Sequence, residues 1–197
     1  RWKRVTGVQT CALPILSVMA GVTIPSISRT LETDRVIRAM PNTPGQIGHG
    51  VTAFVASNAC DAGDRDLAAQ LLEPLGVVEL IPNERLMDVV TAVSGSGPAY
   101  VFLLAEFLAA AAEAEGLDRD IAARLARQTV AGAGALMLET GESASNLRKQ
   151  VTSPGGTTQA ALDVLQAGDG LGPVMRRAVA AATQRSRELG RDAESQT

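Results

Sequence analysis

The sequence predicts an α/β fold with a parallel sheet in its first part, followed by an all-helical second part. Short apolar runs broken by turn residues fill residues 16–83, where strand-like and helix-like segments alternate. From residue 84 onward the segments become long, alanine-rich and helical in spacing. Because 46% of the residues are hydrophobic and only 3% are aromatic, we expect a buried core made mostly of aliphatic side chains.

The elements of the first part follow from local signals. The predicted strands are 16–20, 35–39, 51–56 and 77–81, and the predicted helix is 64–75. The pair Gly21-Val22 is expected to turn the chain after the first strand, and Pro41 and Pro44 stop the second. Gly76 stands where the helix is expected to stop.

Long helices are expected in the second part. They are predicted at 98–115, 118–139, 158–166 and 173–189, with a short helix capped by Ser145 between the second and third. Gly190 is expected to close the last helix. The stretch 98–115 is apolar nearly all round, which is typical of a helix buried on more than one side, often against a second subunit. Gly132 and Gly134 predict a close approach between helices.

Composition argues against several classes of function. The net charge is −3 and the basic residues are scattered, so no nucleic-acid partner is expected. The two Cys are far apart and His49 is the only histidine, so no metal site is expected. Charged residues interrupt the apolar runs before the roughly 18 residues that span a bilayer. We therefore expect no membrane segment and a cytoplasmic protein.

The first 15 residues, RWKRVTGVQTCALPI, carry no hydrophobic period that continues into the rest of the chain. They also lack the features of a signal peptide. They resemble translated sequencing-adapter read-through, so we expect a non-native segment joined to a chain that was longer upstream. An unusual native terminus is the alternative.

Three polar loops are candidates for function. AMPNTP (39–44) follows a predicted strand, where ligands bind in open parallel sheets, although it can also be read as a rigid turn. SGSGPAY (94–100) opens a helix but lacks the Gly-Lys-Ser/Thr ending of a triphosphate loop. VTSPGGTT (151–158) places hydroxyl and N–H groups at a helix start, which suits a small carboxylate or an ordinary capped turn.

In this order the three strings resemble the pyrroline-5-carboxylate reductase family. Flanking stretches agree, namely MAGV (19–22), QTVAGAGALMLETGE (128–142) and RSRELG (185–190), so the resemblance covers 16–190. It implies a Rossmann-like domain that binds NADPH (or NADH), a helical domain that forms a homodimer, and dimers assembled into larger rings. The implied reaction is the reduction of 1-pyrroline-5-carboxylate to L-proline by hydride transfer, the last step of proline biosynthesis.

The resemblance also implies site residues and domains. The nicotinamide side would be lined by Ala20, Gly21, Ala39, Met40, Pro41, Asn42 and Thr43. The substrate carboxylate would be held by Ser153, Gly155, Gly156 and Thr157, with the Thr158 hydroxyl facing the ring nitrogen as the catalytic group. The implied division is 1–15 non-native, 16–83 the later part of the nucleotide domain, 84–190 helical, and 191–197 a tail.

One departure from the family pattern and two rival interpretations remain. The glycine-rich turn that binds the cofactor pyrophosphate is absent, so we expect the first strands to be missing and the chain alone to be weak or inactive. A β-hydroxyacid dehydrogenase would use a catalytic lysine on a helix, but the chain has only Lys3 and Lys149. A helical dimerisation module without activity is the other rival.

Overall fold

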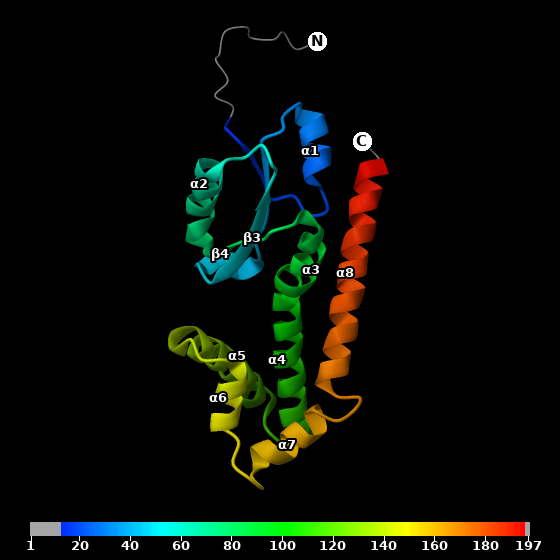
Figure 1. Cartoon of the computed structure of the whole chain (residues 1–197). Coiled ribbons are helices and arrows are strands. Elements are labelled where there is room, and N and C mark those ends of the chain that lie inside the picture. The colour runs from blue at the N-terminus through cyan, green and yellow to red at the C-terminus, as the bar shows by residue number, and fades with distance from the viewer. Residues whose placement is uncertain (1–12, 196–197) are drawn as a thin grey trace. The chain divides into compact units, whose positions relative to one another are not determined.

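The computed structural model describes residues 13–195 and divides the chain into two compact units. The first unit runs to Ser96 and takes in the chain again from Ala181, and the second is Gly97–Ala180. Figure 1 shows the elements in chain order, from the strands near the N-terminus to the long C-terminal helix. Residues 1–12 of the suspected non-native segment lie outside the described residues, and its last residue, Ile15, begins strand β1.

The first unit contains a sheet in the order β1 (Ile15–Ser17), β2 (Val36–Met40), β3 (Gly50–Ala56) and β4 (Gly76–Leu80). The α/β character is as expected, but the prediction of a parallel sheet is wrong for one pair. The pairs β1–β2 and β3–β4 are parallel, whereas β2 and β3 are antiparallel. The reason is the connection between β2 and β3, which is too short for the crossover of a dozen or more residues that parallel neighbours require.

Two helices accompany the sheet. The helix α2 (Ala62–Leu72) continues into a 3₁₀ turn, Glu73–Leu75, close to its expected end. It packs on one face of the sheet, where its buried side chains join Ile37 and Phe54 in the core. The sequence interpretation missed α1 (Ile24–Leu31), which Thr23 caps by accepting a hydrogen bond from the Ser26 N–H.

Asp64 ties α2 to the start of β2. Its carboxylate forms a capping box with Asp61 and accepts two hydrogen bonds from the Arg35 guanidinium, one of them at 3.2 Å from Nε. The hydrogen bonds from Arg35, and further the Asp61 N–H, lower the pKa of the Asp64 carboxyl below its usual value. The resulting stabilisation is present above the pKa of the unfolded chain and is lost as the pH falls through the lowered pKa.

The second part is helical throughout, as expected. Its helices are α4 (Gly97–Ala114), α5 (Arg119–Thr140), α6 (Ala144–Gln150), α7 (Thr157–Leu165) and α8 (Leu171–Ser195). Asp118 caps α5 and Gly141 ends it at φ +64°, both as the sequence indicates. Two details were wrong. Ser143, not Ser145, caps α6, and α8 continues through Gly190 instead of ending there.

Gly190 lies inside α8, where it allows another part of the backbone to approach the helix closely. A Cβ added there would lie 3.3 Å from the carbonyl oxygen of Gly21. The glycine therefore allows the last turns of α8 to lie against the turn that follows β1. The glycine near the end of the predicted helix therefore marks a close contact between two backbone segments and not the end of the helix.

The motif SGSGPAY is helical for most of its length, contrary to the loop that we expected. A four-residue helix, α3 (Met87–Val90), leads into a π-helical turn at Thr91–Gly95, and α4 follows. The hydroxyl of Thr91 donates to the Met87 carbonyl at 2.8 Å, and that of Ser94 donates to the Val90 carbonyl at 2.9 Å. Such hydroxyl bonds back to the preceding turn let serine and threonine lie within a helix.

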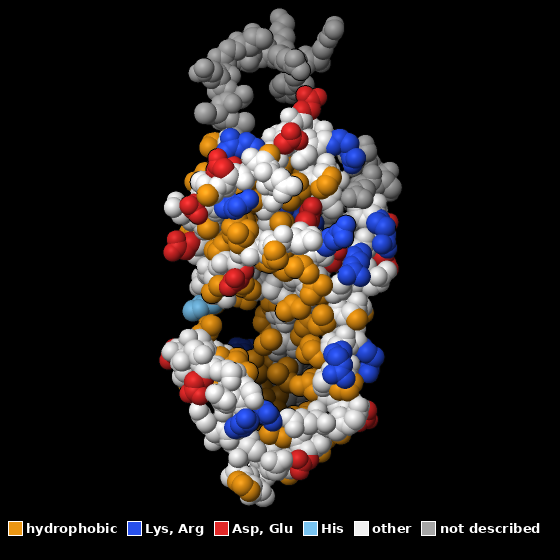
Figure 2. All heavy atoms as spheres, in the orientation of Figure 1, with side chains coloured by type: hydrophobic (Ala, Val, Ile, Leu, Met, Phe, Trp, Pro, Cys, Tyr) orange, Lys and Arg blue, Asp and Glu red, His pale blue; other side chains and the backbone are white. Residues whose placement is uncertain are grey.

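The helix α4 buries no residue within the single chain. Phe102 and Phe107 are 61% and 65% exposed, and Figure 2 shows apolar side chains gathered along α4. Atoms that would be Cβ on Gly132 and Gly134 meet nothing within 4 Å, so the expected close approach is not made within the chain. By length and composition alone, the helical stretch Glu84–Ala114 could also cross a membrane, because it contains an 18-residue window with a mean hydropathy of 1.3.

Candidate functional site

The segment 39–44 lies at the carboxyl end of β2. Ala39 is buried in the core, Met40 is the last residue of the strand, and Thr43 begins a 3₁₀ turn, Thr43–Ile47. The sequence interpretation took Asn42 and Thr43 as the polar groups available to a ligand. The side chain of Asn42 is used within the protein, because Oδ1 accepts from the Val51 N–H at 3.0 Å and Nδ2 donates to the Ser94 carbonyl at 3.2 Å.

Asn42 therefore joins the first of the three motifs to the second. The two segments also touch at Gly95, where an added Cβ would lie 2.7 Å from Cε of Met40. Met40–Thr43 and Gly95 line a cavity of about 480 Å³. The polar groups that this segment can offer to a ligand are thus the Thr43 hydroxyl and the backbone. The Asn42 side chain instead holds the segment to Val51 and Ser94.

The turn after β1 lies at the same edge of the sheet. Ala20 and Gly21 form this turn, and Gly21 has φ +76°, which a side chain would strain. Since β1 and β2 are parallel neighbours, their carboxyl ends share one edge. All seven residues expected to line the nicotinamide side therefore belong to two segments at the edge where α/β sheets bind nucleotides.

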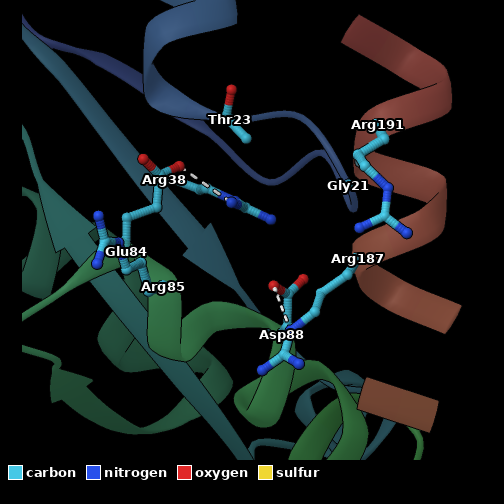
Figure 3. Close-up of a pocket in the computed structure, with 9 residues that line it drawn as sticks. Gly21, Thr23, Arg38, Glu84, Arg85, Asp88, Arg187 and Arg191 are labelled. Atoms are coloured by element: carbon cyan, nitrogen blue, oxygen red, sulfur yellow. Dashed lines mark hydrogen bonds and ion pairs between the residues drawn. The ribbon is translucent and has the colours of Figure 1, made fainter. Parts of the chain in front are cut away.

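A buried ion pair supports this edge from one face of the sheet. Arg38 on β2 has a side chain only 6% exposed, and its Nη1 lies 3.0 Å from Oε1 of Glu84. The same oxygen accepts the N–H of Ile24 at 2.7 Å, so Glu84 holds the start of α1 to β2. The sequence interpretation missed both residues, although a charged residue inside the run RVIRA was a usable signal. Figure 3 shows this pair near Thr23, with Gly21 across the cavity next to α8.

The residues expected to bind substrate lie in the second unit, around the start of α7. Gly155 has φ +71°, and the N–H of Gly156 donates to the Ser153 carbonyl at 3.0 Å in a tight turn. Gly156 is the N-cap of α7 and has no side chain to cap it. The first N–H groups of α7 thus lack an intrahelical acceptor, which leaves donors at Thr157 and Thr158 for an anion.

Comparisons with known proteins connect these segments to one family. Residues 84–189 match the family model described as pyrroline-5-carboxylate reductase dimerisation. A protein named pyrroline-5-carboxylate reductase from Synechocystis is 44% identical over 177 residues, which cover 90% of this chain and 66% of that protein. Pyrroline-5-carboxylate reductase 1 from Bacillus subtilis is 39% identical over 91% of this chain and 60% of its own length.

Solved structures of similar proteins indicate the same family. The structure of a pyrroline-5-carboxylate reductase from Coxiella burnetii superposes with a TM-score of 0.84 at 42% identity, over 88% of this chain and 64% of that one. A Plasmodium falciparum pyrroline carboxylate reductase with NADP bound has a TM-score of 0.77 at 28% identity, over 90% and 71%. The chain thus spans somewhat under two thirds of the length of most of these relatives.

Proposed function

The chain belongs to the pyrroline-5-carboxylate reductase family, and on that premise we propose that the complete protein reduces 1-pyrroline-5-carboxylate to L-proline with NADPH or NADH. The observation that carries the proposal is the match over residues 84–189, which includes the whole SPGGTT segment. Ala20-Gly21 and residues 39–43 lie at the carboxyl ends of the parallel neighbours β1 and β2, at one edge of the sheet, and this placement supports the proposal independently. We also propose the division into a nucleotide domain at 16–83 and a helical domain at 84–190.

The cofactor would be held at the carboxyl edge of β1 and β2. The αL turn at Gly21 and the cavity beside Met40–Thr43 fit a flat ring approached closely by backbone. When bound, the reduced nicotinamide supplies the hydride that the carbon of the C=N bond accepts. Arg38 and Glu84 do not need to touch the cofactor for this role. They would keep the carboxyl ends of β1 and β2 in place, since their contacts hold β2 and α1 together.

The substrate would be held by the start of α7. Ser153, Gly155, Gly156 and Thr157 would surround its carboxylate. The N–H groups at the start of α7 that have no acceptor within the protein would bind it, while the Gly156 N–H keeps the turn closed on Ser153. The Thr158 hydroxyl would orient the imine N–H and stabilise the amine that forms. Positioning then contributes most of the rate, since a protonated imine already accepts hydride readily.

We propose a homodimer, with larger rings built from it, as the assembly of the complete protein. The exposed apolar side chains of α4 lie inside the region that matches the dimerisation family. A second copy of the chain would bury them and would also approach Gly132 and Gly134. Burial against a second copy would also explain why the stretch 84–114 is so apolar, so that no membrane is needed to cover it. This agrees with the proposal of a cytoplasmic enzyme.

The proposed function is tested by completing the nucleotide domain. The N-terminal segment of the Synechocystis relative is joined ahead of Leu16, and NADPH oxidation with pyrroline-5-carboxylate is compared with that of the chain alone. Turnover on the order of 1 s⁻¹ or faster is expected only in the completed protein. A completed protein that is folded and dimeric but forms no proline would point to a dimerisation module without activity.

Thr158→Ala in the completed protein is expected to lower kcat/KM about tenfold or more, equivalent to about 1.4 kcal/mol of lost transition-state stabilisation. The reason is the loss of the hydroxyl that orients the imine nitrogen. Steady-state kinetics measure the change, and Thr158→Ser, which keeps a hydroxyl, serves as the matched control. An alanine variant within about twofold of the parent would contradict the assigned role.

A further inference from the structure

The first unit contains a second cavity, of about 450 Å³, whose lining is strongly basic. It lies among β2, the segment 84–88 and the last turns of α8. Its charged lining residues are Arg38, Arg85, Arg187, Arg191, Glu84 and Asp88, which together carry a net charge of +2. The volume falls within the roughly 300–1,000 Å³ typical of small-molecule sites.

Both carboxylates of the cavity are already engaged by the protein. Glu84 accepts from Arg38 and from the Ile24 N–H, as described above. Asp88 accepts from the Ser186 hydroxyl at 2.7 Å through Oδ1, and its Oδ2 lies 3.8 Å from Nε of Arg187. The excess positive charge is therefore not balanced by the acids that line the cavity.

With Arg38 beside Glu84 and Arg187 beside Asp88, the excess positive charge is that of Arg85 and Arg191. Two of the four arginines, Arg187 and Arg191, lie on α8. They are four residues apart on α8, so they share one face of the helix, and Figure 3 shows both beside the cavity with Arg187 extending toward Asp88. The contact of Arg187 with Asp88 is long and uses Nε, which leaves its Nη groups available. Among the residues that the structure describes, Arg191 forms no ion pair, although its charge interacts with the Glu188 carboxylate three residues earlier.

The backbone holds these two arginines at the cavity. Gly190 lies against Gly21, where a Cβ would approach the carbonyl oxygen to 3.3 Å, and the Ser186–Asp88 bond fixes α8 one turn earlier. Like charges one helical turn apart repel each other unless an anion lies between them. The arrangement thus keeps two repelling guanidinium groups together.

We propose that this cavity binds a phosphate group, either inorganic phosphate or the phosphate of a small monoester. Guanidinium groups bind phosphate through paired N–H donors, and two of them from one helix face, with a cavity beside them, match a tetrahedral dianion. Carboxylates at the cavity wall hold Arg38 and Arg187 in place and leave Arg191 to the ligand. This inference does not depend on the proposed reductase activity.

The test uses the 197-residue chain without cofactor. Isothermal titration measures the dissociation constants of inorganic phosphate and of ribose 5-phosphate at constant ionic strength, with chloride as the reference anion. We expect saturable binding of phosphate with a dissociation constant of about 1 mM or lower. Tighter binding of ribose 5-phosphate would assign the cavity to a monoester, and equal or weaker binding would assign it to free phosphate.

Arg191→Gln is the decisive variant, because the Arg191 side chain is exposed and forms no ion pair with a described residue, so its loss should leave the fold intact. It is expected to raise the dissociation constant of phosphate at least about fivefold, while Arg177→Gln, the same charge change elsewhere on α8, leaves it within about twofold. Circular dichroism confirms that both variants fold.

Three outcomes would overturn the proposal. They are the absence of saturable binding, an equal loss in Arg191→Gln and Arg177→Gln, and full displacement of phosphate by NADPH. Equal losses would mean general charge screening. Displacement by NADPH would mean that the cavity is part of the cofactor site.

Discussion

Gly76→Ala is expected to destabilise the first unit by about 3 kcal/mol or more, enough to unfold much of a marginally stable domain. Gly76 begins β4 at φ +126°, a conformation that side chains rarely adopt. An added Cβ would lie 2.2 Å from the carbonyl oxygen of Gly50. That oxygen cannot move away, because Gly50 is the residue of β3 that pairs with Gly76.

Urea unfolding followed by circular dichroism measures this loss. The matched control is Gly168→Ala, where an added Cβ meets no atom within 4 Å and φ is not positive. The control is expected to change the free energy of unfolding by less than about 0.5 kcal/mol. If Gly76→Ala were as stable as the control, β3 and β4 would not approach each other as described.

Phe107→Glu is expected to convert the proposed dimer into a monomer. Phe107 projects from α4 with 65% of its surface exposed in the single chain, within the region that matches the dimerisation family. A dimer that covers α4 would bury two new carboxylates, one from each copy. At a few kcal/mol for each buried, unpaired charge, the dissociation constant should rise by about a hundredfold or more.

Sedimentation equilibrium measures the dissociation constant directly. Leu71→Glu is a fair control, because Leu71 on α2 is an equally apolar residue, 61% exposed, outside the region of the family match. The control should dimerise like the parent chain. A Phe107→Glu variant that dimerised as tightly as the control would mean that α4 does not form the interface.

Local signals in the sequence were sufficient for most elements. The capping Asp118, the αL Gly141 and the spacing of apolar residues set α5 within a residue of its predicted bounds, because each acts within one or two helical turns. The strands β3 and β4 were found from their short apolar runs, the second of which lies between Gly76 and Pro82. The three motifs identified the family, since they are strings of residues and do not depend on the fold.

The tertiary structure decided what depends on residues far apart in the chain. It paired β2 with β3 antiparallel, kept α8 helical through Gly190, and engaged the side chain of Asn42 with Val51 and Ser94. It also brought Asp88 to Ser186, 98 residues away, and so built the basic cavity. Helix caps and hydrophobic periods act over a few residues and can be read directly. Packing and long-range ion pairs depend on which surfaces meet, and only the folded chain specifies that.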